Sequence, residues 1–90
     1  MRKYYFEKKF RKKLSIFFKK DQRRYKIIMK KIEEITDTDK IDHYKNLRKP
    51  LQDYKRVKID SHFVILFKYD KSIDSIYFFD LDHHDKIYRH

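Results

Sequence analysis

The segment Asp82-His83-His84-Asp85-Lys86-Ile87-Tyr88 follows an apolar run and holds residue types suited to proton transfer. Histidine changes its charge near neutral pH, so an imidazole here can give or take a proton under cellular conditions. Tyr88 adds an aromatic platform four residues after His84. Because adjacent side chains of a strand point to opposite faces, we expect at most one of the two histidines to enter a site, with His83 packing or capping instead.

The composition limits which cofactors the chain can hold. The absence of Cys excludes disulfides and thiolate zinc sites and fits a reducing compartment. The absence of Gly excludes a Gly-rich phosphate loop and leaves the turns to Asp, Asn and Ser. His62, His83, His84 and Asp85 are metal-ligand residue types, but no spacing among them favours a metal site. We therefore expect no cofactor and no metal.

Positive charge is concentrated in the first third of the chain. Residues 1–31 hold 14 Lys and Arg against two acidic residues, a net charge of +12, whereas residues 32–90 hold 11 against 12. Such a field attracts phosphate backbones and makes binding dependent on salt. Lys-rich helices are also simply well solvated, so charge alone leaves both interpretations open. We take Lys12, Lys13 and Arg23 as candidate contacts to RNA.

Two helices are expected in this basic third. Apolar residues recur at helical spacing in both, and Asp21 is a suitable N-cap for the second. The first stripe is Phe10, Leu14, Phe17 and Phe18, and the second is Tyr25, Ile28, Ile32 and Ile35. We interpret the aromatic members of the first stripe, together with Phe67, as core residues. The two segments predict an antiparallel helical hairpin.

The rest of the chain predicts a sheet of about four mostly antiparallel strands. The β-prone segments are 4–6, 57–59, 63–67 and 76–81. The continuously apolar run at 63–67 is typical of a central strand covered on both faces. The hairpin packed on this sheet, followed by a short C-terminal tail, predicts a single α+β domain over residues 1–90. No apolar run approaches the roughly 20 residues of a membrane span and no signal-peptide pattern opens the chain, so we expect a cytoplasmic protein without a membrane partner.

The order of these elements, together with three motifs, resembles the RelE/ParE toxin superfamily over nearly the whole chain. The motifs are Lys49-Pro50-Leu51-Gln52, the two strands from Val57 to Lys68, and the final stretch from His83 to Tyr88. They look most similar to the YafQ-like branch, in which a Pro-Leu-Gln loop precedes strands that end in a His-containing tail. The resemblance implies a RelE-like fold. It also implies the toxin of a type II toxin-antitoxin system, an mRNA interferase that cleaves translated mRNA without metal.

The resemblance further implies roles for five residues in an attack of the 2′-hydroxyl on the neighbouring phosphate. His84 lies where the branch has a catalytic histidine and would act as general acid, and His62 is the candidate base. Lys58 would stabilise charge, and Lys49, before the Pro-Leu-Gln motif, would hold a phosphate. Tyr88 matches the terminal aromatic residue and would stack on the scissile base.

Further RNA contacts are expected around the strand that begins near residue 55. Arg56 and Lys58 share one face by the two-residue period, whereas Lys55 shares the other with Val57. We assign Arg56 and Lys55 to RNA binding. The assignment is better supported for Arg56, because it shares a face with Lys58. Phe63 matches an aromatic position of the YafQ-like branch, and we assign it to RNA binding too.

The resemblance also names partners and alternatives. The partners would be the ribosome, mRNA and a cognate antitoxin of RelB/DinJ type, an extended acidic chain that binds one toxin monomer within a hetero-oligomer. Val64 stands where many RelE-type members have a strand arginine that stabilises the transition state. This departure keeps two alternatives open, a ParE-like inhibitor of DNA gyrase and a catalytically weak RNA-binding homologue.

Overall fold

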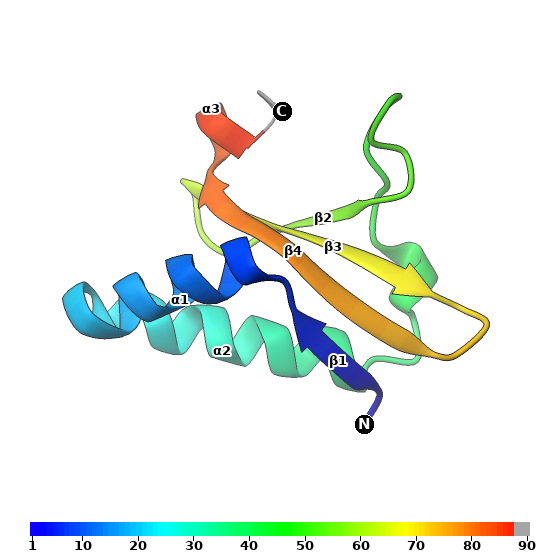
Figure 1. The fold of residues 1–90 in the computed structure, drawn as a ribbon, viewed down its shortest axis with the longest axis horizontal. Coiled ribbons are helices and arrows are strands. Elements are labelled where there is room, and N and C mark those ends of the chain that lie inside the picture. The colour runs from blue at the N-terminus through cyan, green and yellow to red at the C-terminus, as the bar shows by residue number, and fades with distance from the viewer. Residues whose placement is uncertain (88–90) are drawn as a thin grey trace.

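The computed structural model describes residues 1–87 and consists of two layers (Figure 1). The elements are β1 (Lys3–Phe6), α1 (Lys8–Lys20), α2 (Gln22–Asp37), the 3-10 turn η1 (Ile41–His43), β2 (Lys55–Lys58), β3 (Phe63–Asp70), β4 (Ser75–His83) and α3 (His84–Ile87). Helices α1 and α2 cover one face of a four-stranded sheet, which confirms the predicted α+β class. Within the described residues, no helix has the length and apolar character needed to cross a membrane.

The helical hairpin forms where the apolar periodicity predicts it. The Asp21 carboxylate accepts a hydrogen bond from the Arg24 backbone N–H at 3.1 Å and caps α2 as expected. The prediction that Phe18 is a core residue is wrong, because it is 52% exposed. Neighbouring helical residues point about 100° apart, so Phe17 packs against the core while Phe18 lies outside, against the Tyr25 ring. The buried residues of the hairpin are Phe10, Leu14, Ile28, Ile32, Ile35 and Thr36.

The strand order in the sheet is β1-β4-β3-β2. β2, β3 and β4 form an antiparallel meander, whereas β1 pairs in parallel with the first half of β4. A β-bulge shifts the register between β3 and β4, since Leu66 pairs with Asp80 and Phe67 with Phe78. After Phe6 the Glu7 N–H donates to the Phe78 carbonyl at 2.9 Å, and the chain then leaves the sheet as α1. α1 continues along the second half of β4, where β1 no longer covers the strand.

Both faces of β3 are covered along residues 64–67, as the apolar run at 63–67 predicts. On the face opposite the helices, Val64 and Leu66 are at most 1% exposed beneath Ile87 of α3, with Leu47 and Phe79 packed beside them. α3 and the loop between η1 and β2 rise on this side of the sheet (Figure 1). On the helical face, the strands contribute Ile65, Phe67, Ile76, Phe78 and Leu81 to the main core.

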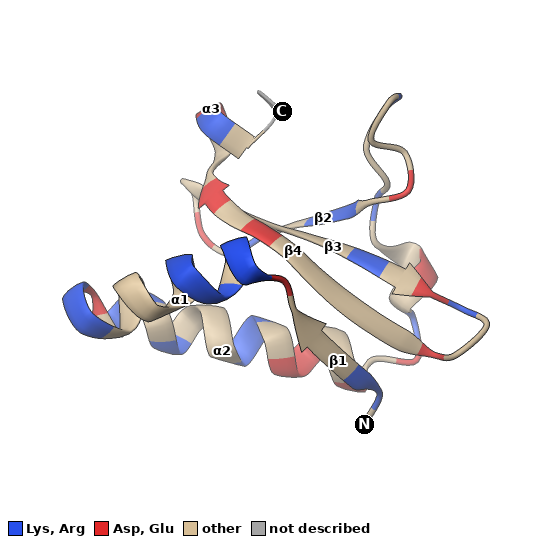
Figure 2. Ribbon diagram, in the orientation of Figure 1, with Lys and Arg blue, Asp and Glu red and all other residues tan. Residues whose placement is uncertain are grey.

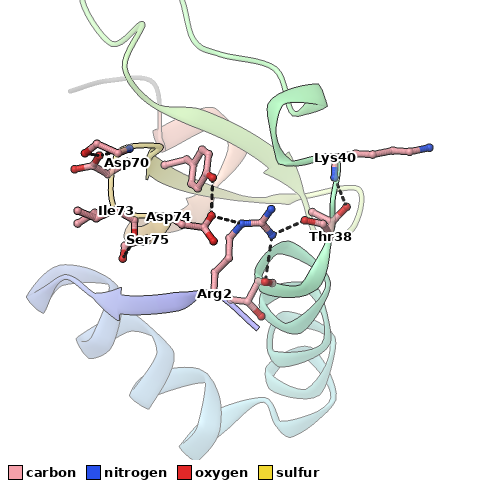
Figure 3. Close-up of polar contacts among 10 residues, drawn as sticks. Arg2, Thr38, Lys40, Asp70, Ile73, Asp74 and Ser75 are labelled. Atoms are coloured by element: carbon pink, nitrogen blue, oxygen red, sulfur yellow. Dashed lines mark hydrogen bonds and ion pairs between the residues drawn. The ribbon is translucent and has the colours of Figure 1, made fainter.

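Aspartates make tight turns in this glycine-free chain. Asp74, in the turn between β3 and β4, adopts a φ of 49°, in the left-handed region that glycine usually occupies. Its carboxylate accepts hydrogen bonds from Arg2 Nε–H at 2.8 Å and from the Tyr69 hydroxyl at 2.6 Å. The Arg2 guanidinium also donates to the carbonyls of Thr36 and Thr38 at the end of α2 (Figure 3). Arg2 therefore joins the start of the chain to α2 and to the β3–β4 turn.

Candidate active site

Three hydrogen bonds to Asp60 shape the turn between β2 and β3, which carries His62. Asp60 Oδ1 accepts the backbone N–H groups of His62 at 2.8 Å and Phe63 at 3.1 Å. Arg24 of α2 donates its Nε–H to Asp60 Oδ2 at 3.0 Å. Burial opposes ionisation of Asp60, but these hydrogen bonds outweigh it and hold the pKa of the carboxyl below its usual range. The exposed side chain of His62 therefore projects from a turn whose backbone is fixed.

His84 is tied to the same turn. Its backbone N–H donates to the His62 carbonyl at 2.8 Å, at the point where β4 ends and α3 begins. The His84 side chain is 52% exposed, and its Nδ1 lies 3.1 Å from Asp85 Oδ1. This contact orients the imidazole through Nδ1, so Nε2 is the atom left to act on a substrate.

His83 completes a cluster of three imidazoles. Its Nδ1 accepts a hydrogen bond from the Asp85 N–H at 3.3 Å in the first turn of α3, in line with the expected capping role. Its ring stacks on the His62 ring with 5.8 Å between centroids and lies 6.1 Å from the His84 ring. The expected separation of His83 and His84 onto opposite faces is wrong, because the chain changes from strand to helix at His84.

Lys13 was a candidate RNA contact, but its ammonium group is engaged within the fold. Lys13 Nζ lies 2.7 Å from Asp80 Oδ1 and 2.8 Å from Asp82 Oδ2 on β4. Burial opposes the charge on Lys13, but the hydrogen bonds to the two carboxylates raise the pKa of its ammonium group above the ordinary value. Lys9 Nζ reaches the other oxygen of Asp80 at 3.2 Å. Lys13 therefore holds α1 against β4, and its contact with RNA stays a prediction.

Lys55 and Phe63 are also engaged in internal contacts. Lys55 is only 8% exposed, and its ammonium group donates to the Tyr44 carbonyl at 3.0 Å and to Asn46 Oδ1 at 2.9 Å. The Phe63 ring is half-buried, with the Arg24 guanidinium 4.6 Å from its centroid. The assignment of Lys55 to an exposed RNA-binding surface is therefore wrong, and Phe63 supports the turn that carries His62.

Two cationic residues lie on the face of the sheet away from the helices. In the antiparallel pairing of β2 with β3, Arg56 is opposite Leu66 and Lys58 is opposite Val64. Directly paired residues share a face, so Arg56 and Lys58 lie on one face, as predicted, and this is the face covered by α3. Lys58 is exposed and Arg56 is half-buried.

A groove of about 380 Å³ opens in the loop before β2. It contains the predicted phosphate-binding residue Lys49 and the predicted RNA contact Arg56. It also contains Arg48, which the sequence analysis missed although it precedes Lys49 directly. Three cations around one concave surface suit a phosphate backbone. The lining consists of Asn46, Leu47, Arg48, Lys49, Pro50, Leu51 and Arg56.

The basic helices form a separate surface. Lys12 and Arg23, both predicted RNA contacts, are exposed on α1 and α2. Figure 2 shows Lys and Arg positions along α1 and acidic positions toward the end of β4.

The predicted site residues thus fall into two groups. His62 and His84 lie together, and Lys58 is at the same end of the sheet, since Val64 pairs with both Lys58 and Asp82. Lys49 and Arg56 form the groove. Tyr88 lies outside the described residues.

One relative has high identity over most of both chains. No protein-family model matches the sequence. A curated protein of Methanocaldococcus jannaschii, named "Putative toxin RelE4", is 51% identical over 71 residues, which cover 79% of this chain and 73% of that protein. The chain belongs to the RelE/ParE superfamily of toxins, as its motifs suggest.

Solved toxin structures share the fold at low identity. The YoeB/ParE toxin of Agrobacterium tumefaciens gives a TM-score of 0.79 at 13% identity and covers 91% of this chain and 98% of its own. The YoeB-YefM complex of Staphylococcus aureus gives a TM-score of 0.76 at 14% identity, and the match covers 93% of this chain and 98% of that chain. YafQ of E. coli gives a TM-score of 0.69 at 16% identity, and the match covers 98% of this chain and 99% of that chain. These similarities confirm the RelE-like fold.

Proposed function

We propose that this chain is the toxin of a type II toxin-antitoxin system and that it cleaves translated mRNA on the ribosome. The observation that carries the proposal is the pairing of two exposed histidines, His62 and His84, through a backbone hydrogen bond of 2.8 Å. Two imidazoles at one place provide both a base and an acid for the same phosphodiester. Lys58, at the same end of the sheet, would provide positive charge.

The proposed reaction needs no group beyond these side chains and the RNA. His62 accepts the proton of the 2′-hydroxyl, whose oxygen attacks the adjacent phosphorus. The bond from phosphorus to the 5′-oxygen then breaks, and His84 donates a proton from Nε2 to that oxygen. The products are a 2′,3′-cyclic phosphate and a free 5′-hydroxyl. Asp85 holds the His84 ring at 3.1 Å from its Nδ1, and Lys58 stabilises the charge of the phosphorane.

The remaining surfaces would position the RNA. Arg48, Lys49 and Arg56 around the loop groove suit phosphates that flank the cleaved bond. Lys12 and Arg23 on the helices suit ribosomal RNA, because they are exposed on the opposite layer of the fold. We propose that Tyr88 stacks on the scissile base.

We also propose that an antitoxin neutralises the protein in the cytoplasm. The Staphylococcus aureus YoeB toxin with this fold forms a complex with YefM. A net charge of +11 favours an acidic partner here. An extended chain that orders on binding would cover the face of the sheet that carries Arg56 and Lys58 and keep RNA from it.

A translating extract tests the nuclease. Wild-type protein should produce ribosome-dependent cuts in a reporter message, which primer extension detects, and His84→Ala should remove them. His43→Ala is the matched control, because His43 is exposed in η1 on another part of the surface. Cuts that persist unchanged in His84→Ala would refute the assigned acid, and an intact message with blocked translation would indicate an inhibitor that only binds RNA.

A second candidate is a ParE-like inhibitor of DNA gyrase. It is favoured by Val64, which is 1% exposed beneath α3 and leaves this strand position without a cation for a transition state. An intact message together with normal translation, and inhibition of purified gyrase, would support this function instead.

A further inference from the structure

The junction of β4 and α3 brings metal-ligand side chains together that sequence spacing does not connect. β4 ends at His83 and α3 begins at His84, so three consecutive side chains surround one point instead of alternating across a sheet. Ligand atoms of His83, His84 and Asp85 all lie within 4.8 Å of one another. The Asp85 carboxylate lies between the imidazoles, with Oδ1 3.1 Å from His84 Nδ1 and Oδ2 3.6 Å from His83 Nδ1.

The two contacts of the Asp85 carboxylate have the separations of atoms bound to one metal ion. Ligand atoms about 2.0–2.1 Å from a tetrahedral zinc ion lie roughly 3.4 Å apart. The two contacts of the Asp85 carboxylate, at 3.1 and 3.6 Å, fall on either side of that value, whereas the ligand atoms of the whole cluster lie up to 4.8 Å apart, so the side chains must rotate to close on one ion. Two imidazoles with a carboxylate are a donor set that suits zinc and similar divalent transition metals, whereas magnesium and calcium prefer oxygen ligands alone.

The cluster is both accessible and held in place. The side chains of His83, His84 and Asp85 are 35%, 52% and 65% exposed, so an ion can enter from solvent. The backbone is fixed by the 2.8 Å hydrogen bond from His84 N–H to the His62 carbonyl and by Ile87, which is fully buried. The His62 ring stacks on His83 at 5.8 Å and offers a further imidazole, from residues 1–87, for a fourth position, which water can also fill.

We propose that His83, His84 and Asp85 bind one divalent transition-metal ion of the zinc type. Binding at the Nδ1 atoms displaces the weak hydrogen bond from Asp85 N–H to His83 at 3.3 Å. The imidazolium form of His84, which would act as the general acid, carries a proton on both ring nitrogens. A metal ion bound to Nδ1 takes the place of one of these protons, so the imidazolium form cannot arise. On the proposed nuclease function, such an ion deprives the site of its general acid and inhibits cleavage reversibly.

Metal binding is tested on purified, untagged protein that has been stripped of metal, without RNA or ribosomes. Calorimetric titration with zinc chloride should show one ion per chain, and cobalt should give the visible absorption of a tetrahedral site. His84→Ala and Asp85→Asn should each weaken zinc binding by about tenfold or more, while His43→Ala should leave it unchanged. Circular dichroism checks that each variant is folded, and if one is not, the other decides.

Two outcomes would overturn the site: no binding to wild-type protein, or equal binding by wild type, His84→Ala and Asp85→Asn. The inhibitory effect has a separate test, in which added zinc should reduce message cleavage and a zinc-selective chelator should restore it. Zinc binding without any cleavage by the metal-free protein would refute the nuclease and leave the metal site standing. Zinc binding with undiminished cleavage would refute the inhibition.

Discussion

Replacing Lys13 by Met should remove the main polar link between α1 and β4. The Lys13 ammonium group lies 2.7 Å from Asp80 Oδ1 and 2.8 Å from Asp82 Oδ2. Asp80 is fully buried, and its remaining partners include Lys9 Nζ at 3.2 Å and the Leu81 N–H at 2.8 Å. Met keeps the approximate length and apolar stem of Lys, so the substitution isolates the loss of charge.

The expected loss of stability follows from the burial of Asp80. Removing one partner of a buried ion pair costs about 3–5 kcal/mol, because the other charge stays behind. Lys13 is 29% exposed and Lys9 remains beside the carboxylate, so we expect a smaller loss, of about 2–3 kcal/mol. For a domain of this size, each kcal/mol lowers the midpoint of thermal unfolding by about 4–8 °C. The variant should therefore unfold about 8–24 °C below the wild type.

The pH dependence gives a second measure of the same interaction. Burial opposes ionisation of Asp80 and Asp82, but the hydrogen bonds from Lys13 help to hold the pKa of each carboxyl below its usual range. A carboxyl whose pKa is lower in the folded protein stabilises the fold at pH values above its unfolded-state pKa of about 3.9. This stabilisation is lost as the pH falls through the pKa of the folded state. The stability difference between wild type and Lys13→Met should thus be full at neutral pH and shrink below about pH 4.

Urea and thermal unfolding, followed by circular dichroism, measure these differences. Lys12→Met is the control, because Lys12 is the next residue of the same helix and is exposed. It should change the free energy of unfolding by less than about 0.5 kcal/mol. Equal stabilities for the Lys12 and Lys13 variants, or a difference that persists undiminished in acid, would refute the buried ion pair as the link between the layers.

Two further predictions concern the basic surface and the β2–β3 turn. Lys12→Glu and Arg23→Glu should each weaken cosedimentation with ribosomes and make it less dependent on salt, because each removes an exposed cation from a helix. Lys71→Glu, in the β3–β4 turn, is the control. Equal effects from this control would contradict a role for the helices in ribosome binding. Asp60→Asn should lower the free energy of unfolding by about 1.5–3 kcal/mol at pH 7, because it removes the ion pair with Arg24 and weakens two hydrogen bonds to backbone N–H groups. Since the pKa of Asp60 is depressed, the difference in stability between wild type and Asp60→Asn should shrink below about pH 4. A difference that stays constant in acid would contradict a contribution from the charge of Asp60.

Much of the fold could be predicted from sequence, because its elements depend on residues close together in the chain. The 3.6-residue period placed both helices, and Asp21 predicted the start of α2 through a hydrogen bond to a residue three positions away. The apolar run at 63–67 predicted a strand covered on both faces, which Val64 and Ile65 confirm on opposite sides. The family resemblance also depended on the order of local motifs.

The arrangement of the site depended on contacts between distant residues. Lys13 and Asp80 are 67 positions apart, so no local pattern showed that this cation is used within the fold. Arg24 fixes the turn of His62 through Asp60, at a separation of 36 residues. The two-residue period of a strand predicted opposite faces for His83 and His84, but the change to helix at His84 placed them together with Asp85.

Residue types and local periods therefore determined the elements, the excess of positive charge and the histidines available for chemistry. Tertiary structure decided which cations stay exposed and which imidazoles meet. The physical reason is that a buried carboxylate such as Asp80 must recruit a counter-charge from whatever element packs against it. That choice is made by packing between layers, which a local sequence pattern does not encode.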